Sequence, residues 1–582
     1  MTPYRREESG LEPVLLGLLG ALVVVALVVW AATGVAALLS GHAWPRVSAG
    51  QVAQAVLALP EHAGDPRLAW PMGVQAGLPG APVFYLALAL VVSVLAVLAW
   101  VAVGLGLNAP SGRRREQGAR WGTHRELAGL RDGRGFRLLS WRAADQQGRL
   151  ALGYRGRALL RAEARHALVV FGPPQSGKSA GVAIPALLEW PGPAVASSIK
   201  TDLLSASARR RAALGQVMVF DPFGLSGMPG ATWSPLRLAV SWDGALSTAL
   251  RLSAAAELDT ATVKGGNYWL AAAEQRLAPL LWVAAQTGAG IAAVVRWAYG
   301  QGDAELPPIL HRLLDQAAGE QALADAQAAY DAHVAFEALA GETRSSIEST
   351  VQMLLRAYRS PLVQRSALGC EVTAERLLSG SHTLYLIGDS HRSRLLRPIF
   401  LTLLQELVDH AFHAATLNGG RLERPLLLCL DELGNVAPLP NLAEVASTAP
   451  SHNIQLVSIF HDIAQARSRY GDQVQTVINS HRARILLPGV ADLETLRYFS
   501  DLLGERVVRE HHRGPDGNRA ELPERRPLAA PQELRQLGDG EALLVYGRLA
   551  PTKLRTRTYF ADRGLRTLAG SDLGAAERSD SG

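Results

Sequence analysis

Residues 172–179 read GPPQSGKS, which has the G-x-x-x-x-G-K-S spacing of a phosphate-binding loop. Gly172 and Gly177 allow the backbone to curl so that its N–H groups point inward at a phosphate. Lys178 can reach the β- and γ-phosphates, and Ser179 offers a hydroxyl to Mg²⁺. The loop lies between an apolar run and a helical run, so a helix N-terminus adds its positive end. The predicted nucleotide-contacting residues are Gly172, Pro173, Pro174, Gln175, Ser176, Gly177, Lys178 and Ser179.

A second stretch that can carry chemistry is LLLCLDELGN, residues 426–435. Its apolar residues predict a buried strand that ends in two adjacent carboxylates. Asp431 would emerge at the carboxyl edge of a sheet beside the loop, where it can hold Mg²⁺ through water. Glu432 can orient and deprotonate the attacking water. An acidic strand end is common near turns, but together with the loop this one indicates an enzyme that hydrolyses the triphosphate, with Lys178 and Glu432 as catalytic residues.

The elements that must position these residues are short apolar runs alternating with helical stretches. Such runs are typical of a mostly parallel sheet covered on both faces, so we predict an α/β fold. The predicted strands are residues 167–172, 194–199, 217–221, 383–388, 426–432, 454–460, 483–489 and 542–547.

One block interrupts this alternation. Residues 243–360 are rich in Ala, Leu, Gln and Glu and have helix-like spacing, which predicts an inserted all-α domain. Residues 166–242 and 361–563 then form the nucleotide-binding domain. The small, polar residues 564–582 have no core pattern, so we expect a disordered tail.

Two runs near the N-terminus, residues 14–39 and 83–107, contain no charged residue. Each exceeds the roughly 20 residues that cross a bilayer, so we predict two transmembrane helices. Arginines precede the first run in residues 1–13 and follow the second in the basic linker 108–165, whereas residues 40–82 contain only two. The positive-inside bias places both termini in the cytoplasm and residues 40–82 outside it.

The remaining composition gives little information about binding partners. The formal net charge of +6 is modest for 582 residues, so sequence-independent contact with nucleic acid is possible. The arginines of residues 506–526 are mixed with acidic residues, which favours a solvated hairpin or loop. Cys370 and Cys429 are the only cysteines, so no disulfide framework is indicated.

Several ordered motifs extend from the apolar runs to the last predicted strand. They are ARWGTHREL (119–127), GPPQSGKS, SIKTDLL (198–204), VFDPFG (219–224), TWSPL (232–236), TLYLIG, DELGNVAPLPNLAEV (431–445), IAQARSRYG (463–471), RYFSDLLGERVV (497–508) and DGEALLVYGRLAPTKLR (539–555). In these motifs the chain resembles the TraG/TraD-type coupling proteins of type IV secretion, the ATPases that deliver conjugative DNA to a secretion channel.

The resemblance implies a RecA-like P-loop motor domain with an inserted all-α domain, preceded by two transmembrane helices in the inner membrane. It implies a ring of six subunits with ATP and Mg²⁺ between neighbours. It also implies single-stranded DNA with its relaxase as cargo, met by the all-α domain, and a type IV secretion channel as partner. By match to the motifs, Lys178, Ser179, Asp431 and Glu432 would carry the nucleotide chemistry.

Two positions depart from that family. Relatives place a glutamine that can sense the γ-phosphate where this chain has His461. The imidazole can donate one hydrogen bond to phosphate, or it only caps a strand. Relatives also have an arginine finger in a turn that reads STAPSHNIQ (447–455) here. Either another arginine serves, with Arg467, Arg482 and Arg484 as candidates, or hydrolysis is slow.

Three alternatives stay open. Lys200 and Asp202 either line the nucleotide cleft or a subunit interface, or form an exposed charged turn. The cargo is either DNA or a protein substrate of a secretion system. The chain is either a motor or a membrane docking protein that hydrolyses weakly or not at all.

Overall fold

The computed structural model describes residues 12–104, 118–132, 148–260, 266–389, 392–513 and 519–570. The chain divides into two units, Met1–Glu116 and Gln117–Gly582. The loop 172–179 and the acid pair both belong to the second unit.

The first unit is built on two apolar helices that pack against each other, α1 (Glu12–Leu39) and α4 (Ala81–Gly104). Each contains an 18-residue stretch, Leu22–Leu39 and Ala81–Leu98, that is long and apolar enough to cross a membrane. The predicted spans therefore coincide with helices, although residues 105–107 lie outside the described chain.

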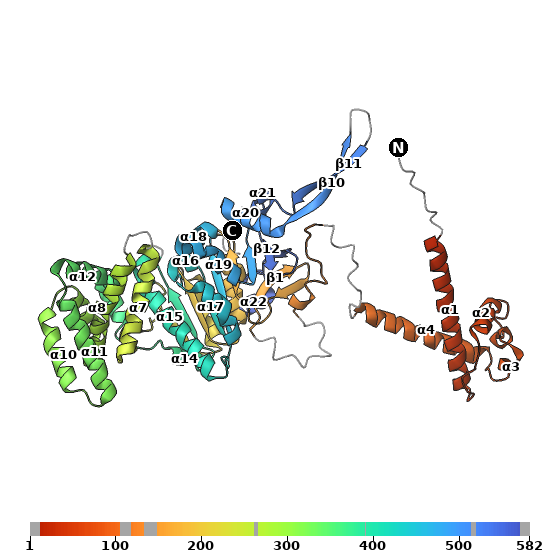
Figure 1. Cartoon of the computed structure of the whole chain (residues 1–582), viewed down its shortest axis with the longest axis horizontal. Helices are drawn as coiled ribbons and strands as arrows, with labels where there is room; N and C mark the ends of the chain where they lie inside the picture. Colours follow the sequence, from red (N-terminus) through yellow and green to blue (C-terminus); the bar gives the residue numbers. More distant parts are fainter. Residues whose placement is uncertain are drawn as a thin grey trace, which may run out of the picture. The chain divides into compact units, whose positions relative to one another are not determined.

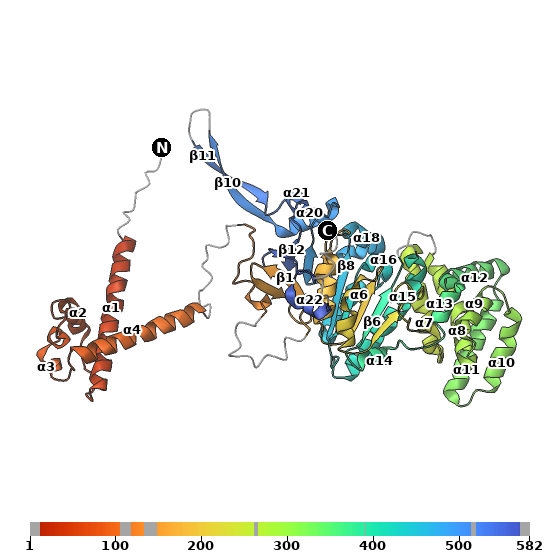
Figure 2. The same ribbon diagram turned by 180° about the vertical axis from the view of Figure 1, so that it is seen from behind.

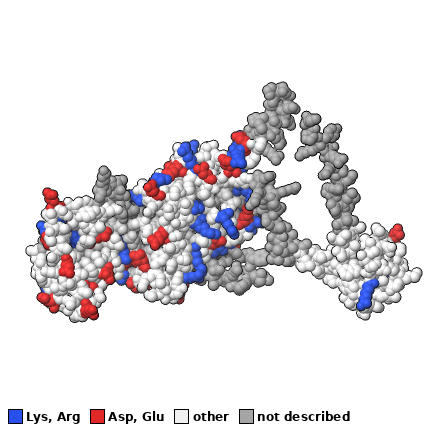
Figure 3. Space-filling model, in the orientation of Figure 1, with Lys and Arg blue, Asp and Glu red and all other residues white. Residues whose placement is uncertain are grey.

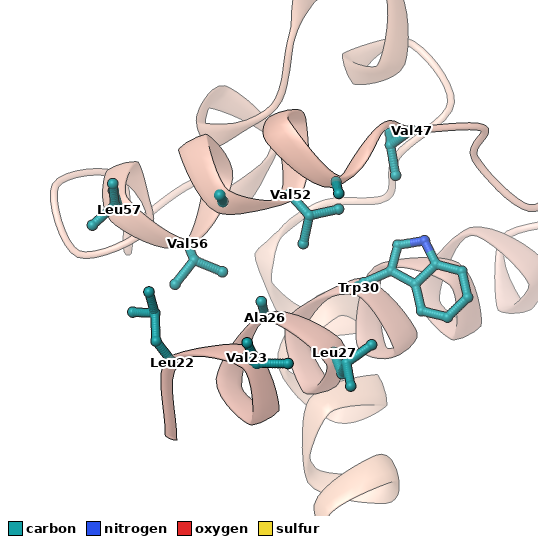
Figure 4. A pocket seen from close by; sticks show the side chains of 11 residues that line it. Leu22, Val23, Ala26, Leu27, Trp30, Val47, Val52, Val56 and Leu57 are labelled. Atoms are coloured by element: carbon teal, nitrogen blue, oxygen red, sulfur yellow. The ribbon is translucent and has the colours of Figure 1, made fainter. Parts of the chain in front are cut away.

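The segment that joins these helices forms short helices: α2 (Ala49–Ala58), a 3₁₀ turn (Pro66–Ala69) and α3 (Met72–Gln75). Trp44 packs edge-on against Trp30 of α1 with ring centroids 5.3 Å apart. A Cβ on Gly34 would lie 2.2 Å from the Trp44 ring, so only glycine fits there. Between α1 and α2 lies an apolar cavity of about 470 Å³. Figure 4 shows Val23 and Leu27 in this cavity on the α1 side.

The second unit is organised around an 11-stranded sheet with the order β2-β1-β13-β12-β9-β3-β8-β7-β4-β6-β5. From β9 to β5 neighbouring strands pair in parallel. These strands are β3 (Leu168–Phe171), β4 (Ala194–Ser198), β5 (Val217–Phe220), β6 (Thr383–Ile387), β7 (Leu426–Leu430), β8 (Ile454–Phe460) and β9 (Ala483–Leu486). Together with β12 (Glu541–Tyr546), they confirm the predicted strands.

Both faces of this sheet are covered, as the apolar runs predicted. Along β3, Val169 and Phe171 join one buried cluster while Leu168 and Val170 join another, because successive side chains of a strand point to opposite faces. One face is covered by α5 (Ile184–Glu189), α6 (Asp202–Ala212) and α22 (Arg563–Ala569). The other is covered by α15 (Ser393–Leu417), α17 (Leu442–Thr448), α18 (Ile463–Tyr470), α19 (Val474–Ser480) and α20 (Leu493–Leu503).

The prediction of a linker over residues 108–165 is wrong for its last part. Residues 151–161 form β1 (Ala151–Arg155) and β2 (Ala158–Arg161), which extend the sheet antiparallel to β13 (Thr552–Arg555). The strands are short and carry arginines, which hides their pattern, yet Leu152 and Leu160 are buried in the core.

A series of helices follows β5 and precedes β6, where the insertion was predicted (Figures 1 and 2). Its core is continuous with the cluster on one face of the sheet. The helices are α7 (Trp242–Thr260), α8 (Gly266–Thr287), α9 (Gly290–Ala298), α10 (Leu306–Asp315), α11 (Glu320–Glu337), α12 (Gly341–Leu355) and α13 (Pro361–Ser366), and α14 (Ala374–Leu378) leads into β6.

Two further segments complete the unit. β10 (Glu505–Arg513) pairs antiparallel with β11 (Arg519–Pro527), and α21 (Pro531–Arg535) follows. The expected disordered tail is corrected for its first residues, because α22 continues to Ala569 and Leu565 is fully buried. Residues 571–582 lie outside the described chain.

Candidate nucleotide site

The loop 172–179 leaves the carboxyl end of β3 and runs into a helix that begins at Ser179. Gln175 and Gly177 have positive φ values of 67° and 86°, so the backbone turns through the left-handed region that glycine favours. A Cβ on Gly172 would lie 2.5 Å from the Ser176 hydroxyl and 3.0 Å from Leu487 Cβ, so this position also requires glycine. Both glycines of the motif therefore serve the curled backbone that was predicted.

Lys178 is held over this loop. Its side chain is buried, and Nζ donates to the Pro173 carbonyl at 3.2 Å and lies 3.0 Å from His461 Nδ1. Burial lowers the pKa of Lys178, which Asp431 partly counters. The ammonium has no carboxylate at hydrogen-bond distance among the described contacts, and an anionic ligand would satisfy it.

The acid pair follows β7, the second neighbour of β3 in the sheet. Ser179 Oγ donates to Asp431 Oδ2 at 2.5 Å, and the Glu432 backbone N–H donates to Oδ1 at 3.0 Å. Burial raises the pKa of Asp431 to about 6, even though the hydrogen bond from Ser179 acts in the opposite direction. The predicted Mg²⁺ residues, Ser179 and Asp431, are thus in direct contact.

Glu432 has a φ of 51°, a left-handed conformation that is uncommon for a residue with a side chain and that clusters at functional sites. Its Oε2 accepts from Asn435 Nδ2 at 3.3 Å and lies 4.0 Å from His461 Nε2.

His461 follows β8, the strand between β3 and β7. Its backbone N–H donates to Gln465 Oε1 at 2.8 Å. Burial, and then Lys178, lowers the pKa of the ring below its ordinary 6.5. The structure therefore brings His461, at the carboxyl end of β8, between the lysine and the glutamate.

A cavity of about 500 Å³ lies at this edge of the sheet. Lys200 and Asp202 line it, in keeping with the first of the two readings given for them. Several lining residues were not predicted as site residues, and the most distant in sequence are Thr558, Tyr559 and Phe560. The only sequence signal for them is an aromatic pair just after the last strand.

The residues present fit a nucleotide with Mg²⁺. Ser176 Oγ is buried and has no hydrogen-bond partner among the described residues, so a donor is available inside the loop. Within the described residues no cluster of three His, Cys, Asp or Glu side chains can hold a metal. Ser179 and Asp431 supply oxygen ligands, and phosphate oxygens and water would complete the shell that Mg²⁺ requires.

None of the arginines predicted as finger candidates is among the residues that line this cavity in the described chain. Arg467 is exposed and pairs with Glu494. Arg482 lies 3.3 Å from Glu163, and Arg484 donates to the Ile478 carbonyl at 3.3 Å. Their role stays a prediction.

Comparison with known proteins places this geometry in a family. The model of the family described as "Type IV secretory system Conjugative DNA transfer" matches residues 138–578. The conjugal transfer protein TraG of Escherichia coli is 26% identical over 364 residues, covering 59% of this chain and 55% of TraG. The protein VirD4 of Rhizobium radiobacter is 24% identical over 432 residues, covering 72% of this chain and 60% of VirD4. The chain thus spans little more than half the length of these relatives.

Solved structures share the fold. The unbound bacterial conjugative coupling protein TrwBdeltaN70 superposes with a TM-score of 0.54 at 17% identity, over 76% of this chain and 93% of the solved chain. TrwB in complex with ADP and Mg²⁺ gives a TM-score of 0.53 at 18% identity, over 76% of this chain and 94% of the solved chain. Since the family model covers well over half of the residues, the chain belongs to the conjugative DNA transfer family of type IV secretion, the family of coupling proteins.

Proposed function

We propose that the chain is an ATPase coupling protein of the inner membrane that drives relaxase-bound single-stranded DNA into a type IV secretion channel. The observation that carries the proposal is that Lys178, Ser179, Asp431 and Glu432 all line the same cavity. The apolar helices α1 and α4 would anchor it with both termini in the cytoplasm.

Each of these residues has a distinct task. Lys178 would neutralise the β- and γ-phosphates, and the loop N–H groups would hold them. Ser179 and Asp431 would hold Mg²⁺, which neutralises developing charge on the phosphates. Glu432 would orient and deprotonate the attacking water. TrwB, whose fold this chain shares, has been solved with ADP and Mg²⁺, which supports these ligands.

His461 would contact the γ-phosphate in place of the glutamine of relatives. It lies 3.0 Å from the lysine and 4.0 Å from the glutamate, between the groups that bind phosphate and activate water. A neutral ring has one N–H donor and one acceptor, and both fit this position.

The charge distribution bears on the partners. Residues 243–360 contain 13 acidic and 8 basic residues, although the whole chain is at +6. The basic excess therefore lies outside the helical insertion, and in Figure 3 basic side chains gather over the sheet body while acidic ones are scattered over the insertion. An acidic insertion suits a protein partner such as the relaxase better than a phosphate backbone. The same observation favours the alternative that proteins alone are the cargo.

A ring of six subunits would place an arginine of one subunit at the site of the next. Arg467, Arg482 and Arg484 stay the candidates. Arg467 and Arg482 are the more available, because they are largely exposed and paired only at the surface, where ion pairs contribute little.

ATP hydrolysis by the full chain in detergent, with and without single-stranded DNA, tests the proposal. We expect the rate of hydrolysis per subunit to rise with protein concentration and with DNA. We expect hydrolysis to be lost in Glu432→Gln. Glu444→Gln, an exposed carboxylate on nearby α17, is the matched control and should keep the wild-type rate. Stimulation by protein substrates but not by DNA would favour the alternative, and the absence of turnover in the wild type would refute the motor.

A further inference from the structure

Residues 556–562, which we call the C-terminal strap, cross the first turn of the helix that follows the phosphate-binding loop. The Tyr559 backbone N–H donates to the Ala180 carbonyl at 3.0 Å. Further back, the Thr556 N–H donates to the Gly540 carbonyl at 2.7 Å, and a Cβ on Gly181 would lie 3.4 Å from Thr556. The strap is therefore tethered to the same turn that carries Ser179.

Charged side chains fix the strap in this place. Arg557 Nη1 lies 2.6 Å from Glu189 Oε1, and its Nε lies 2.9 Å from Asp562 Oδ2. Asp562 also accepts from the Tyr154 hydroxyl at 2.8 Å. These side chains are at most one-fifth exposed, so the pairs are shielded from salt. The residues between them are thus held in one conformation before any ligand arrives.

The strap supplies one wall of the cavity through Thr558, Tyr559 and Phe560. Tyr559 is partly buried against the core, whereas Phe560 is 49% exposed. The two rings meet edge to face with centroids 5.5 Å apart. A single exposed apolar ring is common on protein surfaces, so the observation that points to a ligand is that Phe560 lines this cavity.

The lining of the cavity contains both polar and apolar side chains. Lys178, Ser179 and the acid pair are polar, while Ile184 and the two aromatic rings are apolar. A nucleotide needs both kinds of contact, because it has charged phosphates at one end and a flat base at the other. Once the phosphates occupy the loop, the base has an aromatic wall within the same cavity.

We propose that Phe560 is the stacking platform for the nucleobase, with Tyr559 as its support. The inference rests on the proposed nucleotide binding and adds its base subsite. Base–aromatic stacking is worth roughly 1–3 kcal/mol and tolerates any base, since every base has a π-face. The platform therefore raises affinity for the nucleoside part and favours purines, whose rings cover more of it.

Equilibrium binding of radiolabelled ATP to the full chain in detergent, with competition by inorganic tripolyphosphate, tests the platform. In Phe560→Ala we expect ATP affinity to fall roughly 5- to 150-fold. Tripolyphosphate affinity should stay at the wild-type value, because the loop is untouched. Phe560→Tyr should restore ATP binding. Tyr268→Ala, which removes a ring that is 62% exposed on α8, is the control and should change nothing.

The outcomes separate the two proposals. If the wild type binds neither ATP nor tripolyphosphate, the nucleotide site itself is wrong. If the wild type binds ATP and Phe560→Ala binds it equally well, the platform is wrong and the nucleotide site stands. Equal losses for ATP and tripolyphosphate, or a loss of self-association without a loss of ATP, would also overturn the platform, since Phe560 would then serve structure or subunit contact.

Discussion

Lys178 Nζ lies 3.0 Å from Nδ1 of His461. An ammonium has only donors, so Nδ1 must present its lone pair and the ring must carry its proton on Nε2. That nitrogen lies 4.0 Å from Glu432 Oε2. The neutral histidine therefore lies between the lysine that would bind phosphate, which is at hydrogen-bond distance, and the glutamate that would activate water, which is not.

Replacing His461 tests whether its position between Lys178 and Glu432 contributes to hydrolysis. In His461→Ala we expect hydrolysis to slow by about 10- to 100-fold, because a hydrogen bond to a charged group contributes roughly 1.5–3 kcal/mol. In His461→Gln we expect nearly the wild-type rate, because an amide offers both an acceptor and a donor. His413→Ala, at an exposed position of α15, is the control. Full activity of His461→Ala would reduce the histidine to a strand cap.

The contact between Ser179 and Asp431 predicts how binding depends on Mg²⁺. In Ser179→Ala we expect ATP affinity to fall about 10- to 100-fold with Mg²⁺ present and to match the wild type in EDTA, because only the metal-assisted part is lost. Asp431→Asn should show the same Mg²⁺-dependent loss of ATP affinity. Asp409→Asn, on the exposed face of α15, is the control and should keep the wild-type affinity. Titrations of ATP with and without the metal measure this difference. An equal loss in EDTA would contradict the metal role.

The buried His481 predicts a pH dependence of stability. Its Nε2 lies 2.9 Å from the Ser458 hydroxyl and its Nδ1 lies 2.7 Å from the Val477 carbonyl, so both nitrogens of the neutral ring are satisfied. Burial lowers its pKa from 6.5 to about 4. Below pH 6.5 His481 binds a proton in the unfolded chain but stays neutral in the folded chain. The free energy of unfolding therefore falls as the pH drops towards 4.

We expect the loss from His481 to reach about 3 kcal/mol near pH 4, at roughly 1.4 kcal/mol per pH unit. Urea unfolding of the full chain in detergent at several pH values measures it. His481→Gln should flatten this part of the curve, while His124→Gln, at an exposed position, should not. An unchanged slope in His481→Gln would assign the acid sensitivity to other groups.

The parallel core was predictable from sequence, because strands such as β3 and β7 are buried on both faces and read as continuous apolar runs. The loop and the acid pair were predictable because their spacing is set by local chemistry. By contrast, β1 is half-buried and too short to show a period, and β13 alternates over only four residues. Phe560 was missed because its place beside the loop results from the strap crossing a distant helix, which no local pattern records.

Arg557 gives the strap its position, so its removal should have two separable effects. Burial would raise the pKa of Asp562, yet the hydrogen bonds from Arg557, from the Leu565 N–H and from Tyr154 together outweigh it and hold that pKa below its usual range. In Arg557→Met, Glu189 keeps its ion pair with Arg161 at 2.9 Å, and Asp562 keeps the hydrogen bond from the Tyr154 hydroxyl. We therefore expect a loss of about 1–3 kcal/mol in the free energy of unfolding, less than for a buried charge left wholly unpaired.

The second effect of Arg557→Met concerns the ligand. Because a loosened strap would carry Phe560 away from the cavity, ATP affinity should fall while tripolyphosphate affinity is kept. Arg563→Met, an exposed arginine on α22, is the matched control and should alter neither quantity. Urea unfolding and ATP binding on the same preparations separate the two effects. Lower stability with wild-type ATP affinity would show that the strap holds the fold together without positioning the base.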